Sequence, residues 1–269
     1  MLAELVILGA RGRMGRMVLS ACGKILREKH PAPLAIIGAV ESVGAPGIGQ
    51  KFKVDGLEIM LSDSLEAVVR PGCIVIDFTS PEASLSALEV SVRAGAGHVL
   101  CTTGFTPEQK ARIEDASRRI PLVFSPNMSI GVNVLFKAVE TVARALGGDF
   151  DVEILEAHHN QKKDAPSGTA LGFAEAVARG LKADLERSAV YGRKGMIGAR
   201  PKGEIGIHAI RGGDIVGDHT VLFAGDGERV ELRHLAQSRQ TFAQGALRAA
   251  LFLKGKSPGL YTMSDVLGL

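Results

Sequence analysis

The sequence predicts an α/β protein of two domains, in which a doubly wound parallel sheet is followed by an α+β domain with a mixed sheet. Short apolar runs alternate with helix-like segments over residues 1–128, and a glycine-rich turn joins the first run to the first helix. After residue 203, strand-like runs follow one another with no helix between them, which is typical of antiparallel or mixed sheets.

The first strand is expected over 4–8, and apolar residues at helical spacing predict a helix over 16–25. The turn between them is Gly9-Ala10-Arg11-Gly12-Arg13-Met14-Gly15, with its glycines spaced G-x-x-G-x-x-G. In such a turn one glycine permits the sharp bend, one lets a pyrophosphate approach the backbone, and Gly15 lets the helix pack on the strand. The turn therefore predicts a dinucleotide site.

The second strand, expected over 34–40, ends at Glu41. A carboxylate at this place can accept hydrogen bonds from the hydroxyls of an adenosine ribose. The spacing from Gly15 exceeds the ~20 residues usual for the motif, and the connection at 29–33 accounts for the excess. The alternative is an ordinary surface carboxylate at a strand end, but the glycine turn upstream favours the ribose contact.

The rest of the first domain alternates regularly, which predicts the parallel sheet. Thr79, Thr102, Thr103 and Asn127 stand just past expected strand ends, where ligands bind in such sheets, so they are candidates for the cofactor rim. Strand ends carry turn-forming residues in any case, and that alternative stays open. The expected elements are a short helix at 64–69, strands at 72–78, 97–101 and 121–124, and helices at 81–94 and 108–118.

The domain boundaries are expected near residues 128 and 238, where the pattern changes. The first domain then comprises 1–128, with 238–269 packing back on it, and the second comprises 129–237. The second domain is expected to begin with an apolar-faced helix that Gly147-Gly148-Asp149 stops. Its expected elements are helices at 132–146 and 170–181 and strands at 151–155, 203–210, 215–223 and 229–236; a helix at 240–253 belongs to the returning segment.

The mixed sheet is expected to have one open face. Apolar positions expected on it are Ile205, Ile207, Val221 and Leu232. An exposed apolar face needs a cover, and self-association is the simplest one.

The segment between the strand at 151–155 and the helix at 170–181 carries the strongest chemical signal. It reads Glu156-Ala-His-His-Asn-Gln-Lys-Lys-Asp-Ala-Pro-Ser-Gly-Thr-Ala170. It supplies histidines, lysines and a helix start with small residues, where backbone N–H groups and the helix dipole attract anions. Each feature alone has an ordinary interpretation as a solvated loop or a helix cap. Together they favour proton-coupled chemistry on an acidic substrate.

Composition excludes other classes of function. Hydrophobic residues are 46% and charged residues 23%, with a net charge of only +3 and aromatic residues at 4%, so neither nucleic-acid binding nor a stacking platform is indicated. Cys22, Cys73 and Cys101 lack metal-ligand spacing, so no metal is expected, and they are interpreted as core residues in a reducing compartment. No apolar run approaches the ~18 residues of a membrane helix, and a cytoplasmic protein without membrane partners is expected.

Several motifs together resemble the 4-hydroxy-tetrahydrodipicolinate reductase (dihydrodipicolinate reductase) family over nearly the whole chain. The 156–170 segment is the most specific of them, whereas the glycine turn alone would be weak evidence for the family. The motifs are the 9–15 turn, Asp77-Phe-Thr-Ser-Pro81, Thr102-Thr-Gly-Phe105, Ser125-Pro-Asn-Met-Ser-Ile-Gly-Val-Asn133 and the 156–170 segment.

The resemblance implies a Rossmann-type nucleotide domain, and a substrate domain whose sheet builds a homotetramer. It implies reduction of a small cyclic dicarboxylate in lysine and diaminopimelate biosynthesis, with loss of water and hydride from NADH or NADPH. Carried over by position, His158 is the general acid/base, Lys162 the proton donor and His159 a substrate contact, while Gly168 and Thr169 bind a substrate carboxylate. The cofactor is then lined by Gly9, Ala10, Arg11, Gly12, Arg13, Met14, Glu41, Cys101, Thr102, Thr103, Ser125, Pro126, Asn127 and Met128.

Three positions depart from the family pattern. Ser42 stands where members that favour NADPH often carry arginine, so a ribose phosphate would meet Glu41 without a neighbouring cation. Ser80 stands where some relatives have arginine, which weakens the same phosphate contact. NADH is therefore expected to serve at least as well as NADPH. Cys101 replaces a glycine often seen before Thr102-Thr103, which places a side chain near the expected nicotinamide.

Two rival interpretations remain at this stage. Another nicotinamide dehydrogenase of the aspartate family would explain the first domain but not the 156–170 segment. A non-catalytic NAD-sensing protein would require a module for DNA or a partner, and the sequence has neither a helix-turn-helix pattern nor a basic stripe.

Overall fold

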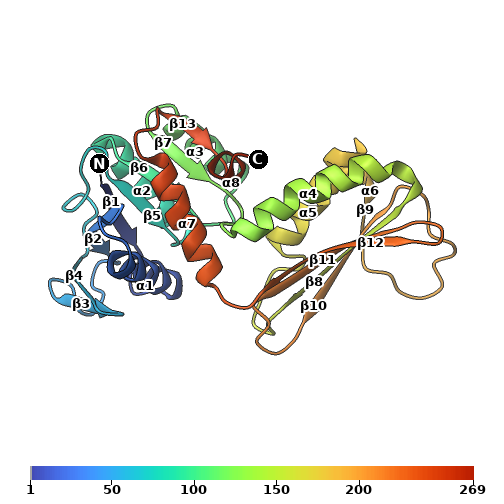
Figure 1. Ribbon diagram of the computed structural model, residues 1–269, viewed down its shortest axis with the longest axis horizontal. Coiled ribbons are helices and arrows are strands. Elements are labelled where there is room, and N and C mark those ends of the chain that lie inside the picture. The colour runs from blue at the N-terminus through green and yellow to red at the C-terminus, as the bar shows by residue number, and fades with distance from the viewer. Residues whose placement is uncertain (1) are drawn as a thin grey trace. The chain divides into compact units, whose positions relative to one another are not determined.

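The computed structural model describes residues 2–269. The chain divides into two compact units, one formed by residues 2–130 and 239–268 and one by residues 131–238. Each unit has its own sheet and its own core, and each is described by itself (Figure 1).

Unit 1, residues 2–130 and 239–268, is built on a sheet in the order β13-β7-β6-β5-β1-β2-β4-β3. All neighbouring strands are parallel except β3 and β4, which form an antiparallel hairpin. The predicted parallel, doubly wound sheet is confirmed. The strands are β1 (Ala3–Leu8), β2 (Leu34–Val40), β3 (Lys51–Val54), β4 (Leu57–Ser62), β5 (Ile74–Asp77), β6 (Gly97–Leu100), β7 (Pro121–Phe124) and β13 (Gly259–Tyr261).

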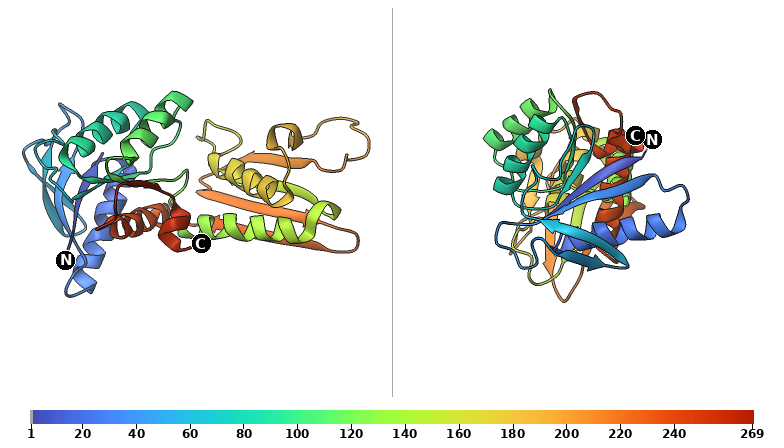
Figure 2. Two further views of the ribbon diagram at one scale, coloured as in Figure 1. Left: turned by 90° about the horizontal axis from the view of Figure 1, so that it is seen from above. Right: turned by 90° about the vertical axis from the view of Figure 1, so that its left-hand side faces the viewer.

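Helices cover both faces of this sheet. On one face α1 packs beside α7, a helix from the far end of the chain, as both views of Figure 2 show. On the other face lie α2 and α3. A Cβ at Gly245 of α7 would lie 1.7 Å from the carbonyl oxygen of Met128, so glycine permits this approach. The helices are α1 (Arg13–Glu28), α2 (Pro81–Ala94), α3 (Pro107–Ser117), α7 (Gln240–Leu253) and α8 (Met263–Leu267).

The prediction of a helix at 64–69 is wrong. The segment forms a single turn, in which the N–H groups of Val68 and Val69 donate to the carbonyl of Leu65. The six residues 64–69, with Pro71-Gly72 shortly after them, are too few to repay helix nucleation. The β3–β4 hairpin was not predicted, although Asp55-Gly56 between two apolar runs is its usual sequence signature, and both residues have positive φ.

Unit 2, residues 131–238, is built on a sheet in the order β12-β11-β8-β10-β9. β10 runs parallel to β8 and β9, whereas β11 runs antiparallel to β8 and β12, so the predicted mixed sheet is confirmed. The strands are β8 (Asp151–His158), β9 (Ala189–Tyr191), β10 (Ile205–Arg211), β11 (Gly217–Ala224) and β12 (Arg229–Ala236). The helices are α4 (Ile130–Leu146), the 3-10 turn η1 (Gly147–Asp149), α5 (Gly168–Leu181) and α6 (Leu185–Ser188).

The face of this sheet that α4 and α5 cover is the one that was expected to be open. Ile205, Ile207 and Val221 are at most 2% exposed and pack in the core with Phe173 of α5, and Leu232 lies against the same core. The prediction that these residues share one face was right, but the prediction that this face is open was wrong. A period-2 pattern does not say which of the two faces a helix will cover.

The opposite face carries apolar side chains that are partly open to solvent. Leu155, Ile210 and Leu235 are 37%, 52% and 52% exposed, and each stands out of phase with the core positions of its strand. We call this surface, with Glu153 and Leu222 between them, the outer face of the β8 sheet.

A charged cluster on the outer face ties down the 192–204 connection. Glu153 accepts hydrogen bonds from Arg193 at 2.9 Å and from Arg200 at 3.0 Å, and His208 Nε2 lies 2.6 Å from the same carboxylate. Burial alone would raise the pKa of Glu153, but the hydrogen bonds from Arg193, His208 and Arg200 outweigh it and lower the pKa to about 2.

This cluster predicts an acid-dependent loss of stability. Because the folded pKa of Glu153 lies below the ordinary 4.5, its contribution is present above pH ~4.5 and is lost as pH falls towards about 2. Glu153→Gln should lower the free energy of unfolding by about 2–3 kcal/mol at pH 7 and by much less at pH 3. Urea titrations of both proteins at the two pH values measure this, and an equal difference at both would contradict it.

Candidate active site

The chemical residues of unit 2 begin on the core face of β8. The strand was expected to end at Leu155, but it continues through His158, paired with β10 on one side and with β11 on the other. Val152, Ile154, Glu156 and His158 therefore alternate onto the face that the helices cover. The apolar half of the strand packs in the core, and its carboxyl end places a carboxylate and an imidazole under the same helices.

Glu156 is the central group of this end. Its side chain is fully buried, and its carboxylate accepts hydrogen bonds from both Nη atoms of Arg211 at 2.8 and 2.7 Å and from the backbone N–H of Ser167 at 3.0 Å. Burial alone would raise the pKa of Glu156, but Arg211, His158 and the Ser167 N–H outweigh it, so the pKa lies below its ordinary value. Glu156 is thus an ionised, anchored acceptor.

His158 is oriented by that carboxylate. Its Nδ1 lies 2.6 Å from Oε2 of Glu156, and an ionised carboxylate can only accept, so Nδ1 carries the proton and Nε2 is left for chemistry. A Cβ at Gly217 would lie 3.1 Å from Nε2, so this glycine leaves the ring atom uncrowded. Burial, with Lys162 and Arg211, lowers the pKa of His158 below its ordinary value against the opposing effect of Glu156.

The turn after β8 brings Lys162 to the same end of the sheet. Its Nζ donates to both carboxylate oxygens of Asp164 at 2.8 and 2.9 Å. Asp164, interpreted from sequence as a turn residue, is thus the ion-pair partner of the predicted proton donor, and this contact holds its pKa below the ordinary value despite partial burial. His159 is half-buried beside the turn, and Lys163 is exposed.

Helix α5 begins where the sequence predicted an anion site. Ser167 caps it, with its Oγ accepting from the N–H of Ala170 at 3.1 Å, and Gly168 and Thr169 are the first helical residues. Because the Ser167 N–H donates to Glu156, the helix start is bound directly to the carboxylate that orients His158. The positive end of the helix dipole therefore lies at the edge of the histidine site.

Two residues of this site were missed by the sequence analysis. Arg211, the last residue of β10, is paired across the sheet with His158, and His219 of β11 is paired with Glu156. The His219 ring lies edge-on to the ring of His158 with centroids 5.2 Å apart, and its Nε2 is 3.2 Å from Ser167 Oγ. Burial, with the nearby charge of His158, lowers the pKa of His219 to about 3. The sequence did contain one signal for His219, since it alternates with Val221 and Phe223 and so falls on the same face of its strand as these core residues.

In unit 1 the glycine turn forms as predicted. Gly9 has φ +69°, and a Cβ at Gly15 would lie 2.1 Å from the Gly9 carbonyl oxygen, so glycine is required where α1 meets the turn. The turn follows β1, from which the chain winds first to β2 and later to β5 in the opposite direction. The crevice between the ends of β1 and β5 is the place where doubly wound sheets bind ligands.

Glu41 lies at this crevice. Its carboxylate accepts the backbone N–H of Arg11 and that of Ser42, each at 3.0 Å, so it is held in place against the glycine turn. A cavity of about 570 Å³ opens beside it, lined by Gly9, Glu41, Ser42, Thr79 and Ser80 among others. The glycine turn, the anchored carboxylate and the cavity fit the adenosine half of a dinucleotide.

A second cavity of about 280 Å³ lies on the other side of the turn. It is lined by Arg13, Met14, Phe78, Cys101, Pro126, Asn127, Met128, Arg239 and Phe242. Six of these were predicted cofactor residues, and the two from the C-terminal segment, Arg239 and Phe242, were not. Cys101 is 9% exposed, and burial raises the pKa of its thiol well above the ordinary value, so it is a neutral wall of the cavity.

The remaining predicted cofactor residues have different surroundings. Ala10, Arg11 and Gly12 form the turn itself. Thr102 is buried and accepts a hydrogen bond from Ser84 Oγ at 2.8 Å, whereas Thr103 is exposed. Ser125 is buried and its Oγ donates to the Asn127 carbonyl at 3.1 Å.

Behind the cavity rim, Thr79 is fixed by a buried carboxylate. Its N–H and Oγ–H donate to Asp77 at 2.8 and 2.7 Å, and the other Asp77 oxygen lies 3.5 Å from Nε2 of His98. Both Asp77 and His98 are fully buried. The end of β5 is thus set by a polar pair inside the core.

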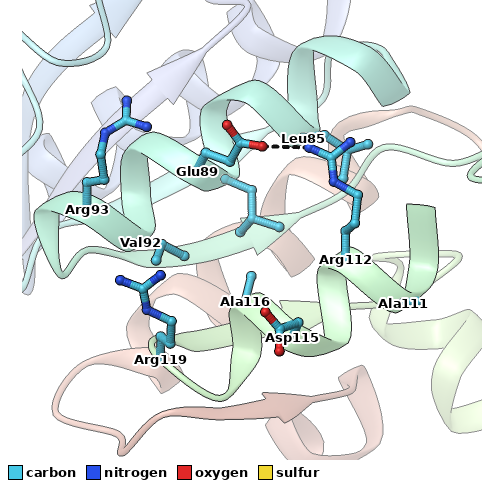
Figure 3. A pocket seen from close by; sticks show the side chains of 10 residues that line it. Leu85, Glu89, Val92, Arg93, Ala111, Arg112, Asp115, Ala116 and Arg119 are labelled. Atoms are coloured by element: carbon cyan, nitrogen blue, oxygen red, sulfur yellow. Dashed lines mark hydrogen bonds and ion pairs between the residues drawn. The ribbon is translucent and has the colours of Figure 1, made fainter. Parts of the chain in front are cut away.

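A third cavity, of about 490 Å³, lies between α2 and α3 (Figure 3). Its floor is apolar, with Leu85 and Val92, and at its rim Arg112 donates to Glu89 at 2.6 Å. It contains none of the residues that the sequence predicted for the cofactor or the substrate.

Among residues 2–269, no helix is long and apolar enough to cross a membrane, and no group of three or more His, Cys, Asp or Glu could hold a metal ion.

Both units match known protein families. A family described as dihydrodipicolinate reductase, N-terminus, matches residues 3–128, and one described as dihydrodipicolinate reductase, C-terminus, matches residues 131–267. The chain belongs to the dihydrodipicolinate reductase family. The family and the oxidoreductase class predicted from sequence are confirmed, and the two rival interpretations are set aside.

Relatives match along their whole length. The 4-hydroxy-tetrahydrodipicolinate reductase of Syntrophotalea carbinolica is 48% identical over 270 residues, which cover 99% of both chains. The enzyme of the same name from Geobacter sulfurreducens is 48% identical over 272 residues, which cover 100% of both. A solved dihydrodipicolinate reductase from Paenisporosarcina sp. TG-14 with bound dipicolinate shares the fold, with a TM-score of 0.75 at 23% identity, covering 98% of this chain and 99% of that one.

Proposed function

We propose that this member of the dihydrodipicolinate reductase family works through His158 and Lys162 at the end of β8. The reaction of the family converts 4-hydroxy-tetrahydrodipicolinate, a reduced nicotinamide nucleotide and a proton into tetrahydrodipicolinate, the oxidised nucleotide and water, in lysine biosynthesis. The observation that carries the assignment is the anchored His158, beside an ion-paired lysine and the start of α5.

His158 and Lys162 have the proton chemistry that the reaction needs. The nicotinamide supplies a hydride, and hydride addition to a conjugated imine leaves negative charge on the ring that a positioned donor must neutralise. His158 holds one proton at Nδ1 against Glu156, so Nε2 is the atom that exchanges protons. Lys162 carries transferable protons and is held by Asp164.

The substrate is a dicarboxylate, and the start of α5 suits one of its carboxylates. Gly168 and Thr169 stand at the positive end of a 14-residue helix. His159, half-buried beside the turn, is proposed as a further substrate contact.

Residues of unit 1 are proposed to hold the nucleotide. The cavity beside Glu41 suits the adenosine, the glycine turn suits the pyrophosphate, and the cavity at Met14, Cys101 and Asn127 suits the nicotinamide. Glu41 has its carboxylate on the ribose side of the turn, while its neighbour is Ser42 rather than a cation. A phosphate at the ribose would therefore be unfavourable, and NADH is expected to serve at least as well as NADPH.

The outer face of the β8 sheet is proposed to join copies of this chain into a homotetramer. Leu155, Ile210 and Leu235 form an apolar surface on a sheet whose other face is already covered. The charges of Glu153 and Arg193 are paired with each other, so burial of this face would leave neither charge without a partner.

Substitution tests the catalytic assignment. His158→Gln and Lys162→Ala should each lower kcat about 10²–10³-fold, because each removes a proton-transfer group, with binding of the nucleotide unchanged. Turnover is followed by nicotinamide absorbance while the preceding synthase condenses pyruvate with aspartate semialdehyde in place. Lys137→Ala, an exposed lysine on α4, is the control. Full turnover in both variants with normal nucleotide binding would refute the assignment.

Cofactor preference is tested by kcat/KM for the two nucleotides. We expect a ratio of NADH to NADPH of one or more, and Ser42→Arg should shift it towards NADPH about tenfold by adding a cation beside the ribose. Ser42→Ala is the control, since it adds no charge. A strong NADPH preference in the unaltered chain would contradict the argument from Glu41.

Native mass measurements test the assembly. The unaltered chain should have the mass of a tetramer, and Ile210→Glu should dissociate the tetramer because it places a charge on the proposed interface. Val134→Glu is the matched control, an apolar residue of similar exposure (44%) on helix α4. A monomeric unaltered chain, or equal effects of both substitutions, would exclude this face.

A further inference from the structure

Arg211 is linked to each part of the proposed proton-transfer site, either directly or through one neighbour. Its two Nη atoms hold the carboxylate of Glu156 at 2.8 and 2.7 Å, and one of them also donates to the backbone carbonyl of Asp164 at 2.7 Å. Through Glu156 it reaches Nδ1 of His158 and the N–H of Ser167. Through Asp164 it reaches the turn that carries Lys162.

We propose that Arg211 and Glu156 are positioning residues of the reaction, whose buried ion pair holds His158, the Lys162 turn and the start of α5 in one arrangement. The proposal rests on the assignment of His158 under the proposed function. Neither residue is proposed to touch the substrate.

The geometry gives the pair more than a packing role. A buried ion pair is weak support for stability, because desolvation offsets most of its attraction, and apolar residues of similar volume often do as well. A guanidinium fork, in contrast, fixes a carboxylate in plane and in register. The carboxylate of Glu156 has to be so fixed, because one oxygen accepts from His158 and the other from the N–H of Ser167, the cap of α5.

The pair also sets the charge at His158. The groups beside this ring are Glu156 on its own strand, Lys162 on the turn with its ion-pair partner Asp164, Arg211 on β10 and His219 on β11, with His234 of β12 beyond His219. Glu156 stabilises the imidazolium, whereas Lys162 and Arg211 oppose it. His219, with its pKa lowered to about 3, is uncharged at neutral pH. Removing Glu156 should therefore shift the pKa of His158 in one direction, and removing Arg211 should shift it in the other.

The decisive experiment follows the titration of the His158 ring by NMR in the full chain with ¹³C-labelled histidine, assigned with His158→Gln. Glu156→Gln should lower the His158 pKa by about one pH unit, and Arg211→Gln should raise it by about one unit. No shift with Glu156→Gln, or shifts of the same sign in both variants, would overturn the proposal. Glu156→Gln is nearly isosteric, so it decides this point even if Arg211→Gln fails to fold.

A second variant separates orientation from charge. Arg211→Lys keeps the positive charge but loses the fork and the contact with the Asp164 carbonyl. We expect the His158 titration to stay near that of the unaltered chain, while kcat falls about tenfold and KM for the nucleotide is unchanged. Undiminished kcat in this variant would refute the positioning role.

Glu153→Gln is the matched control. Glu153 lies on the same strand and, like Glu156, is held by arginine and histidine side chains, here Arg193, Arg200 and His208, but on the opposite face of the sheet. It should leave the His158 titration unchanged; a shift as large as that of Glu156→Gln would reduce the effect to a general loosening of the sheet and refute the proposal. The titration needs no substrate, so absence of turnover in the unaltered chain would count against the proposed function alone.

Discussion

The buried carboxylate of Glu156 is the constraint on which unit 2 depends. An ionised group without contact to water is stable only when its oxygens accept hydrogen bonds from well-placed donors. Those donors come from β8, β10 and the start of α5, and the Arg211 donor on β10 stands 55 residues along the chain from Glu156. Satisfying one buried charge therefore brings together the histidine, the lysine turn and the helix start that we propose for the chemistry.

Close backbone approach has the same role in unit 1. The carbonyl of Gly9 occupies the space where a side chain of residue 15 would lie, so α1 begins directly against the end of β1. This leaves the crevice between β1 and β5 free, with Glu41 held at its rim by backbone N–H groups. The apolar sheet behind the crevice only supports it, and the loops at the strand ends carry the residues that we propose bind the nucleotide.

The sequence predicted most elements because their signals are local. Proline and threonine at 106–107 mark the start of α3, and the alternation in 151–155 marks β8. The same alternation continues through Glu156 and His158, which were assigned to a loop because polar residues seldom continue a core face. Burial of a charge depends on partners from other strands, and no single-segment pattern contains them.

By itself, the sequence determined the strand–turn–helix nucleotide motif, the histidine–lysine segment and the family, because each depends on residue identity at short spacing. The tertiary structure alone decided that Arg211 and His219 belong to the site, since they reach it by pairing across the sheet. It also decided which face of that sheet is covered, placing Ile207 and Val221 inward and Ile210 outward. Side-chain alternation gives two faces of equal pattern, and only the packing of α4 and α5 makes one of them the core.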